Sequence, residues 1–417
     1  MCDFTSIHTL GLFGLASRKS LMKWCLDTFN STRTKSSIIW KSLKHIFANK
    51  FNENYAQALL VLEQCLQLQS SREHNAVAHN SKAMALLAMS TILFKRGNHE
   101  AAMEKLQEIK CLDRSSLDFR GGNTFSYTTI VVSLGDNHFK NVFASMTVRG
   151  IDITGSDNGQ GSNSLNARIR AIEGLVKVVH GDLESGTSNV LHLDPEFETN
   201  SVHTGTLSFG QFLHVSRDFS RAKRLYKSII GEDLENKSFD DTSFLGACNM
   251  THEEVALAAL CALGQLETHM GNFDDAEATL TAALSKAEKL FGSHHPKLGA
   301  VLTCMALLFR MKSKQEQSSS LVIQEGLYRR AIGLLSAPPL DSEGNQVGKG
   351  IDIAAIARGA YAETLRVQQN RRDEGERTMR WAECAWKNRR SSLSDALSFP
   401  KSSLTAPILD TRIMRVL

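Results

Sequence analysis

Apolar and small residues recur at helical spacing in residues 264–296, on both sides of a tight turn. Ala276, Leu280 and Ala283 follow one another at steps of four and three residues, which places them on one face of a helix. Gly264 lies inside the preceding helix, where a glycine costs about 1 kcal/mol relative to alanine. We therefore expect a neighbouring backbone to come close to Gly264. The pattern predicts two antiparallel helices in close contact.

The turn between these helices, and the loop after the second one, carry residues typical of helix ends. Gly271 and Asn272 interrupt the first helix. Gly292 can adopt the left-handed conformation past the end of the second helix, and Pro296 suits the first turn of a third. The arrangement resembles the tetratricopeptide repeat. The lengthened second helix, followed by a glycine, two histidines and a proline, is similar to the repeats of kinesin light chains.

The same pattern recurs along the chain. The packing positions are taken by Gly210, Ala222 and Tyr226 in residues 209–230, by Ala102 in residues 83–109, and by Ala58 in residues 54–68. The copy at 54–68 keeps mainly its second helix, and its first helix would come from residues 38–47. Residues 168–186 and 353–386 carry further copies. Separations of 44 residues between Ala58 and Ala102, and of 54 between Ala222 and Ala276, exceed the standard unit of about 34, which predicts insertions between hairpins.

The composition agrees with a helix-rich chain, because 42% of its 417 residues are apolar and it has only 6 Pro. Stacked hairpins bury a continuous core between neighbours. We predict an all-α fold, a tetratricopeptide-repeat solenoid of helical hairpins with irregular repeats and insertions. The polar stretch at 312–320 is predicted as an extended turn. The predicted parts are a basic Ser/Thr-rich leader at 1–37, N-terminal hairpins at 38–115, an irregular insertion at 116–165, the main solenoid at 166–395, and a tail at 396–417 whose apolar residues cap the final repeat.

The N-terminus is basic. Residues 1–50 hold eight Lys or Arg against Asp3 and Asp27, whereas the whole chain has a net charge of +4. A basic, Ser- and Thr-rich, acid-poor leader is typical of an organellar transit peptide; a solvated basic first helix is the alternative interpretation. We expect an intracellular protein, in a mitochondrion or chloroplast if the leader is a transit peptide and in the cytoplasm otherwise. The apolar runs fall short of the ~20 residues that span a bilayer. The eight cysteines are scattered without a CxxC motif, which indicates free thiols.

Motifs for catalysis or metal binding are weak. His252 begins HEEVA, which lacks the second histidine of a zinc motif. The segment 344–350, GNQVGKG, is one residue short of a phosphate-binding loop and lacks the Ser or Thr that follows it. His294 and His295 have no further ligand at a suitable spacing. We predict neither an enzyme nor a bound cofactor or metal.

The resemblance implies a groove lined by the first helices of successive hairpins, which holds a peptide or a partner helix. The predicted function is therefore a noncatalytic scaffold or adaptor that binds a protein or peptide in this groove. The Lys, Asn and Arg clamp by which chaperone-binding members grip a carboxylate is not evident in the sequence. The alternative is an organellar RNA-associated factor that uses the Arg-rich hairpin at 366–390.

We disfavour nucleic acid as the partner because acidic residues dilute the basic ones in that hairpin, and because Trp381 and Trp386 fall at core positions. We expect its basic side chains to lie on a solvated face; those singled out are Arg371, Arg372, Arg389 and Arg390. The sequence leaves the identity of the partner and the oligomeric state open.

Overall fold

The computed structural model describes residues 76–96, 98–110, 170–178, 181–190, 203–231, 252–317, 320–340, 350–386, 388, 391–398 and 406–417, with isolated helical positions between 56 and 66. The chain divides into two compact units, which are described separately. Unit 1 holds residues 1–120 and 238–245, and unit 2 holds residues 121–237 and 246–417. The predicted leader and insertion, at 1–37 and 116–165, lie outside the described residues.

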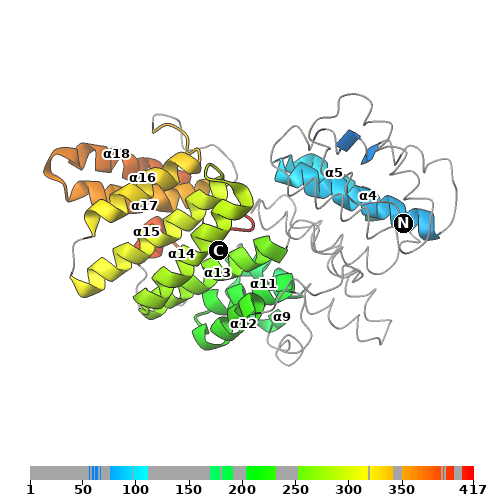
Figure 1. The fold of residues 1–417 in the computed structure, drawn as a ribbon, viewed down its shortest axis with the longest axis horizontal. Helices are drawn as coiled ribbons and strands as arrows, with labels where there is room; N and C mark the ends of the chain where they lie inside the picture. Colours follow the sequence, from blue (N-terminus) through cyan, green and yellow to red (C-terminus); the bar gives the residue numbers. More distant parts are fainter. Residues whose placement is uncertain are drawn as a thin grey trace, which may run out of the picture. The chain divides into compact units, whose positions relative to one another are not determined.

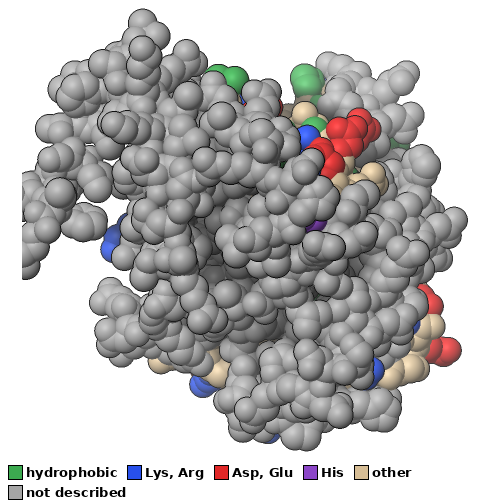
Figure 2. Space-filling model, turned by 90° about the vertical axis from the view of Figure 1, so that its right-hand side faces the viewer, with side chains coloured by type: hydrophobic (Ala, Val, Ile, Leu, Met, Phe, Trp, Pro, Cys, Tyr) green, Lys and Arg blue, Asp and Glu red, His purple; other side chains and the backbone are tan. Residues whose placement is uncertain are grey.

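Unit 1 contains one described hairpin, formed by α4 (Ala76–Lys95) and α5 (His99–Lys110). Leu86, Ala102 and Leu106 are fully buried where the two helices face each other. Asn98 immediately precedes α5, and its side-chain oxygen accepts a hydrogen bond from the backbone N–H of Ala101 (3.3 Å). The other side of α5 is exposed and acidic. Figure 2 shows a group of acidic side chains near the top of the face that it presents.

Unit 2 contains a solenoid of helices and one small β-hairpin. After a helix at 170–178, its elements are α9 (Leu183–Val190), α11 (His203–Val215), α12 (Phe219–Gly231), α13 (His252–Met270), α14 (Phe273–Phe291), α15 (Pro296–Glu316), α16 (Leu321–Leu334), α17 (Ile351–Arg366), a 3-10 turn (Gln369–Arg371), α18 (Arg372–Ala385), α19 (Leu393–Ser398), β1 (Leu409–Asp410) and β2 (Arg415–Val416). The predicted all-α fold is confirmed for the described residues, apart from β1 and β2.

The helices of unit 2 pack as a series of hairpins. Each of α12, α14 and α16 packs against the helix before it and the helix after it. The first helices of the hairpins, α11, α13, α15 and α17, contact one another in that order and form a layer. Figure 1 shows this succession from α11 in green to α18 in orange. We call these four helices the first-helix layer.

The helix ends follow the predicted turn chemistry, with one exception. Gly271 and Gly292 have positive φ angles of 84° and 83°, so each ends a helix as expected. The exception is the polar stretch at 312–320, which was predicted as an extended turn. It mostly continues α15 to Glu316, and Lys312 within it reaches back to Asp274 at the start of α14 (3.0 Å). The turn is therefore short.

The predicted tail also differs from expectation. Of the tail predicted at 396–417, Leu397 of α19 lies 3.1 Å from where a Cβ on Gly359 of α17 would be, beside Leu393, which precedes the tail, at 3.0 Å. Residues 406–417 contact α17 of that repeat through β2, but they are not confined to it. They run back to the first-helix layer, where the N–H of Ala406 donates to the carbonyl of Val215 at the end of α11 (3.0 Å). Their apolar side chains complete the cores between these helices.

Candidate functional site

The small residues at the predicted packing positions lie at close helix contacts. A Cβ built on Gly264 of α13 would stand 2.5 Å from Cγ of Leu280 and 3.5 Å from the carbonyl oxygen of Ala276, both in α14. A Cβ on Gly210 of α11 would stand 2.8 Å from the Tyr226 ring in α12. The structure therefore brings Gly264 to Ala276, and Gly210 to Tyr226.

The remaining predicted packing residues occupy the same kind of position. Ala222, Ala276, Ala283 and Ala102 are fully buried. Gly271 forms the turn between α13 and α14, as described above. Ala58 lies outside the described residues. These positions hold the hairpins together, and they present no chemical groups to a partner.

Polar side chains that could contact a partner lie instead on the first-helix layer, beneath residues 406–417. We call these twelve residues the C-terminal segment. It folds back on itself as the β1–β2 hairpin, in which Leu409 pairs with Val416 and Asp410 with Arg415. Figure 1 marks the C-terminus close to α13, and the contacts place β1 on α13 and β2 on α17. Nearly all of its residues are buried.

Gln265 of α13 binds the backbone of the C-terminal segment. Its side-chain amide donates to the carbonyl oxygen of Leu409 (3.0 Å), and its side-chain oxygen accepts from the N–H of Leu409 (2.7 Å). These two bonds reproduce the pairing that a neighbouring β-strand would supply. Gln265 thus recognises extended backbone without regard to the side chain at that position.

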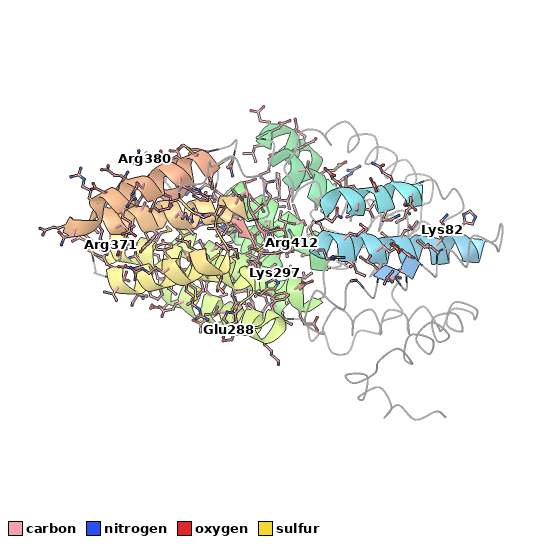
Figure 3. All side chains as sticks on the ribbon, turned by 90° about the horizontal axis from the view of Figure 1, so that it is seen from above. Lys82, Glu288, Lys297, Arg371, Arg380 and Arg412 are labelled. Carbon is pink, nitrogen blue, oxygen red and sulfur yellow. The ribbon has the colours of Figure 1, made fainter. Side chains whose placement is uncertain are left out.

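Arg412 connects the segment to α11. Its guanidinium forms a buried ion pair with Asp410, two residues earlier (2.8 Å), and also donates to the hydroxyl of Ser208 (3.1 Å) and to the side-chain oxygen of Gln211. Both charged side chains are almost wholly withdrawn from water, with exposures of 5% for Arg412 and 0% for Asp410. In Figure 3 the label of Arg412 lies near the centre of the view, among the helices.

Asp352, at the start of α17, holds the second strand of the segment. Its carboxylate accepts from the N–H of Val416 (2.7 Å) and lies 3.5 Å from Nε of Arg415. Burial raises the pKa of Asp352 above its usual value, and the positive charge of Arg415 opposes that shift. Asp352 therefore presents a carboxylate of the layer to this strand.

A buried histidine pair lies between α11, α12 and α13. Nε2 of His214 is 2.9 Å from Nδ1 of His269, and the Tyr226 hydroxyl is 3.3 Å from Nδ1 of His214. Burial lowers the pKa of His214 well below its usual value; burial and the charge of Arg217 lower the pKa of His269 to about 3. Both rings are therefore neutral near pH 7. Tautomers that alternate donor and acceptor would link these three side chains in one chain of hydrogen bonds.

The Arg-rich last hairpin differs from prediction at Arg371. This side chain was expected on a solvated face, but it forms ion pairs with Glu325 of α16 and Glu374 of α18 and donates to the hydroxyl of Tyr361 of α17 (2.9 Å). It therefore ties three helices together at the end of the solenoid (Figure 3). Arg372 is 76% exposed, as expected. Arg389 and Arg390 lie outside the described residues.

The two tryptophans of this hairpin, which were predicted at core positions, both contact the core. Trp381 is buried, and the guanidinium carbon of Arg358 stands 3.9 Å above its ring. Trp386 packs against the same core from a half-buried position and donates from its ring N–H to the carbonyl of Ser391 (2.8 Å). The aromatic side chains therefore help to stabilise the hairpin.

The residues considered for chemistry have structural roles or are exposed. Nδ1 of His295 accepts the N–H of Lys297 (3.1 Å) and caps α15, and its ring stacks on Phe291. His294 is exposed, and His252 begins α13. Residues 344–349 lie outside the described residues. In the described part of the chain, no group of three His, Cys, Asp or Glu is arranged to hold a metal ion.

Sequence reasoning identified the hairpins but missed the occupied first-helix layer. Gln265 and Leu409 are 144 residues apart, and Ser208 and Arg412 are 204 apart. The one signal in the sequence was the apolar character of residues 406–417, which was attributed to capping of the last repeat.

Comparison with known proteins identifies the repeat type in the middle of the solenoid. Residues 255–322, which cover α13, α14 and α15, match the family model for the tetratricopeptide repeat. No curated protein matches the chain. A similar solved structure is described as a Rap protein complexed with competence and sporulation factor; it is 11% identical, with a TM-score of 0.37, over 87% of this chain and 98% of that chain.

Residues 255–322 of the unit 2 solenoid thus match the tetratricopeptide repeat, and the similarity to kinesin light chains remains a prediction. Within the described residues, no helix has the length and apolar character required to cross a membrane.

Proposed function

We propose that the chain is a noncatalytic scaffold that binds a protein partner through an extended segment laid on the first-helix layer. Tetratricopeptide-repeat folds bind proteins or peptides along their first helices. The observation that carries the proposal is the pair of hydrogen bonds between Gln265 and the backbone of Leu409 (3.0 and 2.7 Å). They support the idea that this layer accommodates extended peptide, because the same two bonds are available to any residue except proline.

Apolar contacts on both sides of Gln265 support the same function. Ile408 and Ile413 belong to the buried cluster that includes α11 and α13, whereas Leu409 and Met414 belong to the cluster that includes α15 and α17. The layer therefore accepts aliphatic side chains at two places along an extended segment. Burial of aliphatic side chains would supply most of the binding free energy, and the polar contacts would set the register.

The RNA-associated alternative receives less support from the geometry. A phosphate-binding surface requires basic side chains that are free to meet the backbone of the nucleic acid. Arg371 of the last hairpin is directed at two carboxylates of its own chain, and Arg372 lies 3.5 Å from the carboxylate of Glu376. The location of the protein in the cell remains a prediction, because residues 1–37 are outside the described part.

A displayed library of random twelve-residue peptides, selected on the full chain, tests this function. We expect selection of peptides that are displaced by a large excess of a free synthetic peptide of residues 404–417. A peptide of the same composition in scrambled order is the control, and it should not displace them. Failure to select any peptide, or selection of peptides that the 404–417 peptide does not displace, would contradict the proposal.

A further inference from the structure

We propose that the C-terminal segment is a resident ligand of the first-helix layer, and that a partner binds by displacing it. This inference rests on the proposed function, because it concerns the same layer. It adds that the C-terminal segment covers the layer when no partner is bound. It also adds that the side chains of this segment indicate which side chains a partner should carry. The argument depends on how charge is distributed between the segment and the helices beneath it.

The buried charges of the segment are paired within the segment. Asp410 and Arg412 pair with each other at 2.8 Å, and the backbone N–H of Arg412 also donates to the Asp410 carboxylate (2.7 Å). Removing one member of a buried ion pair leaves an uncompensated charge, which is strongly unfavourable. When the segment leaves, both members leave together. No helix then retains a buried charge that Arg412 or Asp410 had neutralised.

The groups that remain on the helices are mostly neutral. Gln265, Gln211 and Ser208, which contact the segment, can exchange their hydrogen bonds for bonds to water or to another peptide. Asp352 is the exception, because its carboxylate loses Arg415 and the N–H of Val416. Burial raises the pKa of Asp352, which means that its charged form is poorly solvated in the closed layer. Water that reaches the carboxylate when the segment leaves therefore offsets part of the lost contacts. The face is thus suited to exchange one ligand for another.

The resident segment leaves one hydrogen-bonding group of the layer unused. Nε2 of Gln211 is buried and has no hydrogen-bond partner among the described residues. The oxygen of the same amide accepts a hydrogen bond from Arg412. A buried donor without an acceptor is unfavourable. A partner that places a carbonyl or carboxylate oxygen opposite Nε2 of Gln211 would therefore bind more tightly than the resident.

These contacts define the partner as an extended segment of a protein with four features. It has aliphatic side chains at the places of Leu409 and Ile413, and a non-proline residue opposite Gln265. It has an arginine that reaches Ser208 and Gln211, with an acidic residue beside it. It also carries an acceptor for Nε2 of Gln211. The pattern is more restrictive than a general apolar groove, because the arginine and the acidic residue must enter as a pair.

The resident segment competes because it is tethered. Helix α19 ends at Ser398 against α17, so seven residues connect it to Ala406. A tether this short can raise the effective concentration of the resident into the millimolar range. A free peptide of the same sequence should therefore bind the intact chain poorly, and should bind at least tenfold more tightly once the resident is weakened.

The test uses a fluorescent peptide of residues 404–417 and the full chain. Ile413→Asp puts a charge at a buried position of the C-terminal segment and is expected to weaken its binding to the layer. Val367→Asp, at a 66% exposed aliphatic residue, is the matched control. We expect fluorescence anisotropy to show at least tenfold tighter binding to Ile413→Asp than to wild type or Val367→Asp. Addition of Gln265→Ala to Ile413→Asp should remove most of this binding, whereas addition of Gln315→Ala, at an exposed glutamine, should not.

Equal binding of the peptide to wild type and to a folded Ile413→Asp chain would overturn the proposal, as would no binding to that variant. Should Ile413→Asp fail to fold, hydrogen exchange of the wild type decides the question. The amides of Leu409 and Val416 should exchange faster than those of α13, because the segment opens alone. If the amides of Leu409 and Val416 exchanged at the same rate as those of α13, through unfolding of the whole solenoid, the proposal would be overturned.

The two proposals can fail separately. If the 404–417 peptide binds Ile413→Asp but no library peptide binds any chain, the resident segment is real and the scaffold function is wrong. If library peptides bind the layer of the wild type while the amides of Leu409 and Val416 stay protected, the scaffold function stands. The displacement is then wrong.

Discussion

Gly264→Ala tests the close helix contact that defines the central hairpin. The new Cβ would lie 2.5 Å from Cγ and 2.7 Å from Cδ2 of Leu280, well inside ordinary contact distance. Leu280 is fully buried, so its side chain has little room to move. At an unhindered helical site the same substitution stabilises a protein by about 1 kcal/mol. Overpacking in a core costs about 1 to 3 kcal/mol. The net change should lie between neutral and about 2 kcal/mol destabilising.

Gly326→Ala is the matched control, because Gly326 lies inside α16 and a Cβ there meets nothing within 4 Å. This variant should gain about 1 kcal/mol from helix propensity alone. Urea unfolding followed by circular dichroism measures both variants, and their difference should be about 1 to 3 kcal/mol, the overpacking penalty alone. Leu280→Ala in the Gly264→Ala chain should cost less than in wild type. If Gly264→Ala stabilises as much as Gly326→Ala, the packing argument is wrong.

Three further predictions use the same chain. The free energy of unfolding should fall as the pH drops below about 6.5. His269 takes up a proton there in the unfolded chain but not in the folded one, where its pKa is about 3. The loss at pH 5 is roughly 2 kcal/mol for this residue. His269→Gln should flatten the pH dependence of the urea midpoint, and His294→Gln, at an exposed site, should not. Arg371→Gln should lower the melting temperature more than Arg372→Gln, and equal effects would refute the proposed tie between three helices. Ala276→Trp should lower the melting temperature by several degrees, because Ala276 is fully buried; an unchanged value would count against its packing role.

The hairpins could be predicted from sequence because their contacts are local. Gly264 and Leu280, which meet in the structure, are sixteen residues apart, and small residues at helical spacing mark both sides of such a contact. The same reasoning failed for residues 312–316. Their polar character indicates a turn, yet they form the exposed end of α15, where Lys, Gln and Glu favour helix and Lys312 pairs with Asp274.

The occupied layer could not be predicted, because it depends on residues far apart in the chain. Nothing near Gln265 indicates that its amide bonds to Leu409, and Arg412 with its neighbours resembles an ordinary charged terminus. Arg371 shows the same limit, since a basic residue in a charged helix appears solvated until its partners on other helices are known. Local pattern identifies the helices, and tertiary contacts identify the site.

The most direct test of the proposed scaffold function is photo-crosslinking of a library-selected peptide that carries a benzophenone side chain near its centre. Mass spectrometry of the full chain then locates the crosslinked residues. The account predicts crosslinks within α11 and α13, at residues 203–215 and 252–270. Crosslinks confined to the second helices α12 and α14, at residues 219–231 and 273–291, would show that partners bind elsewhere and would contradict the central claim.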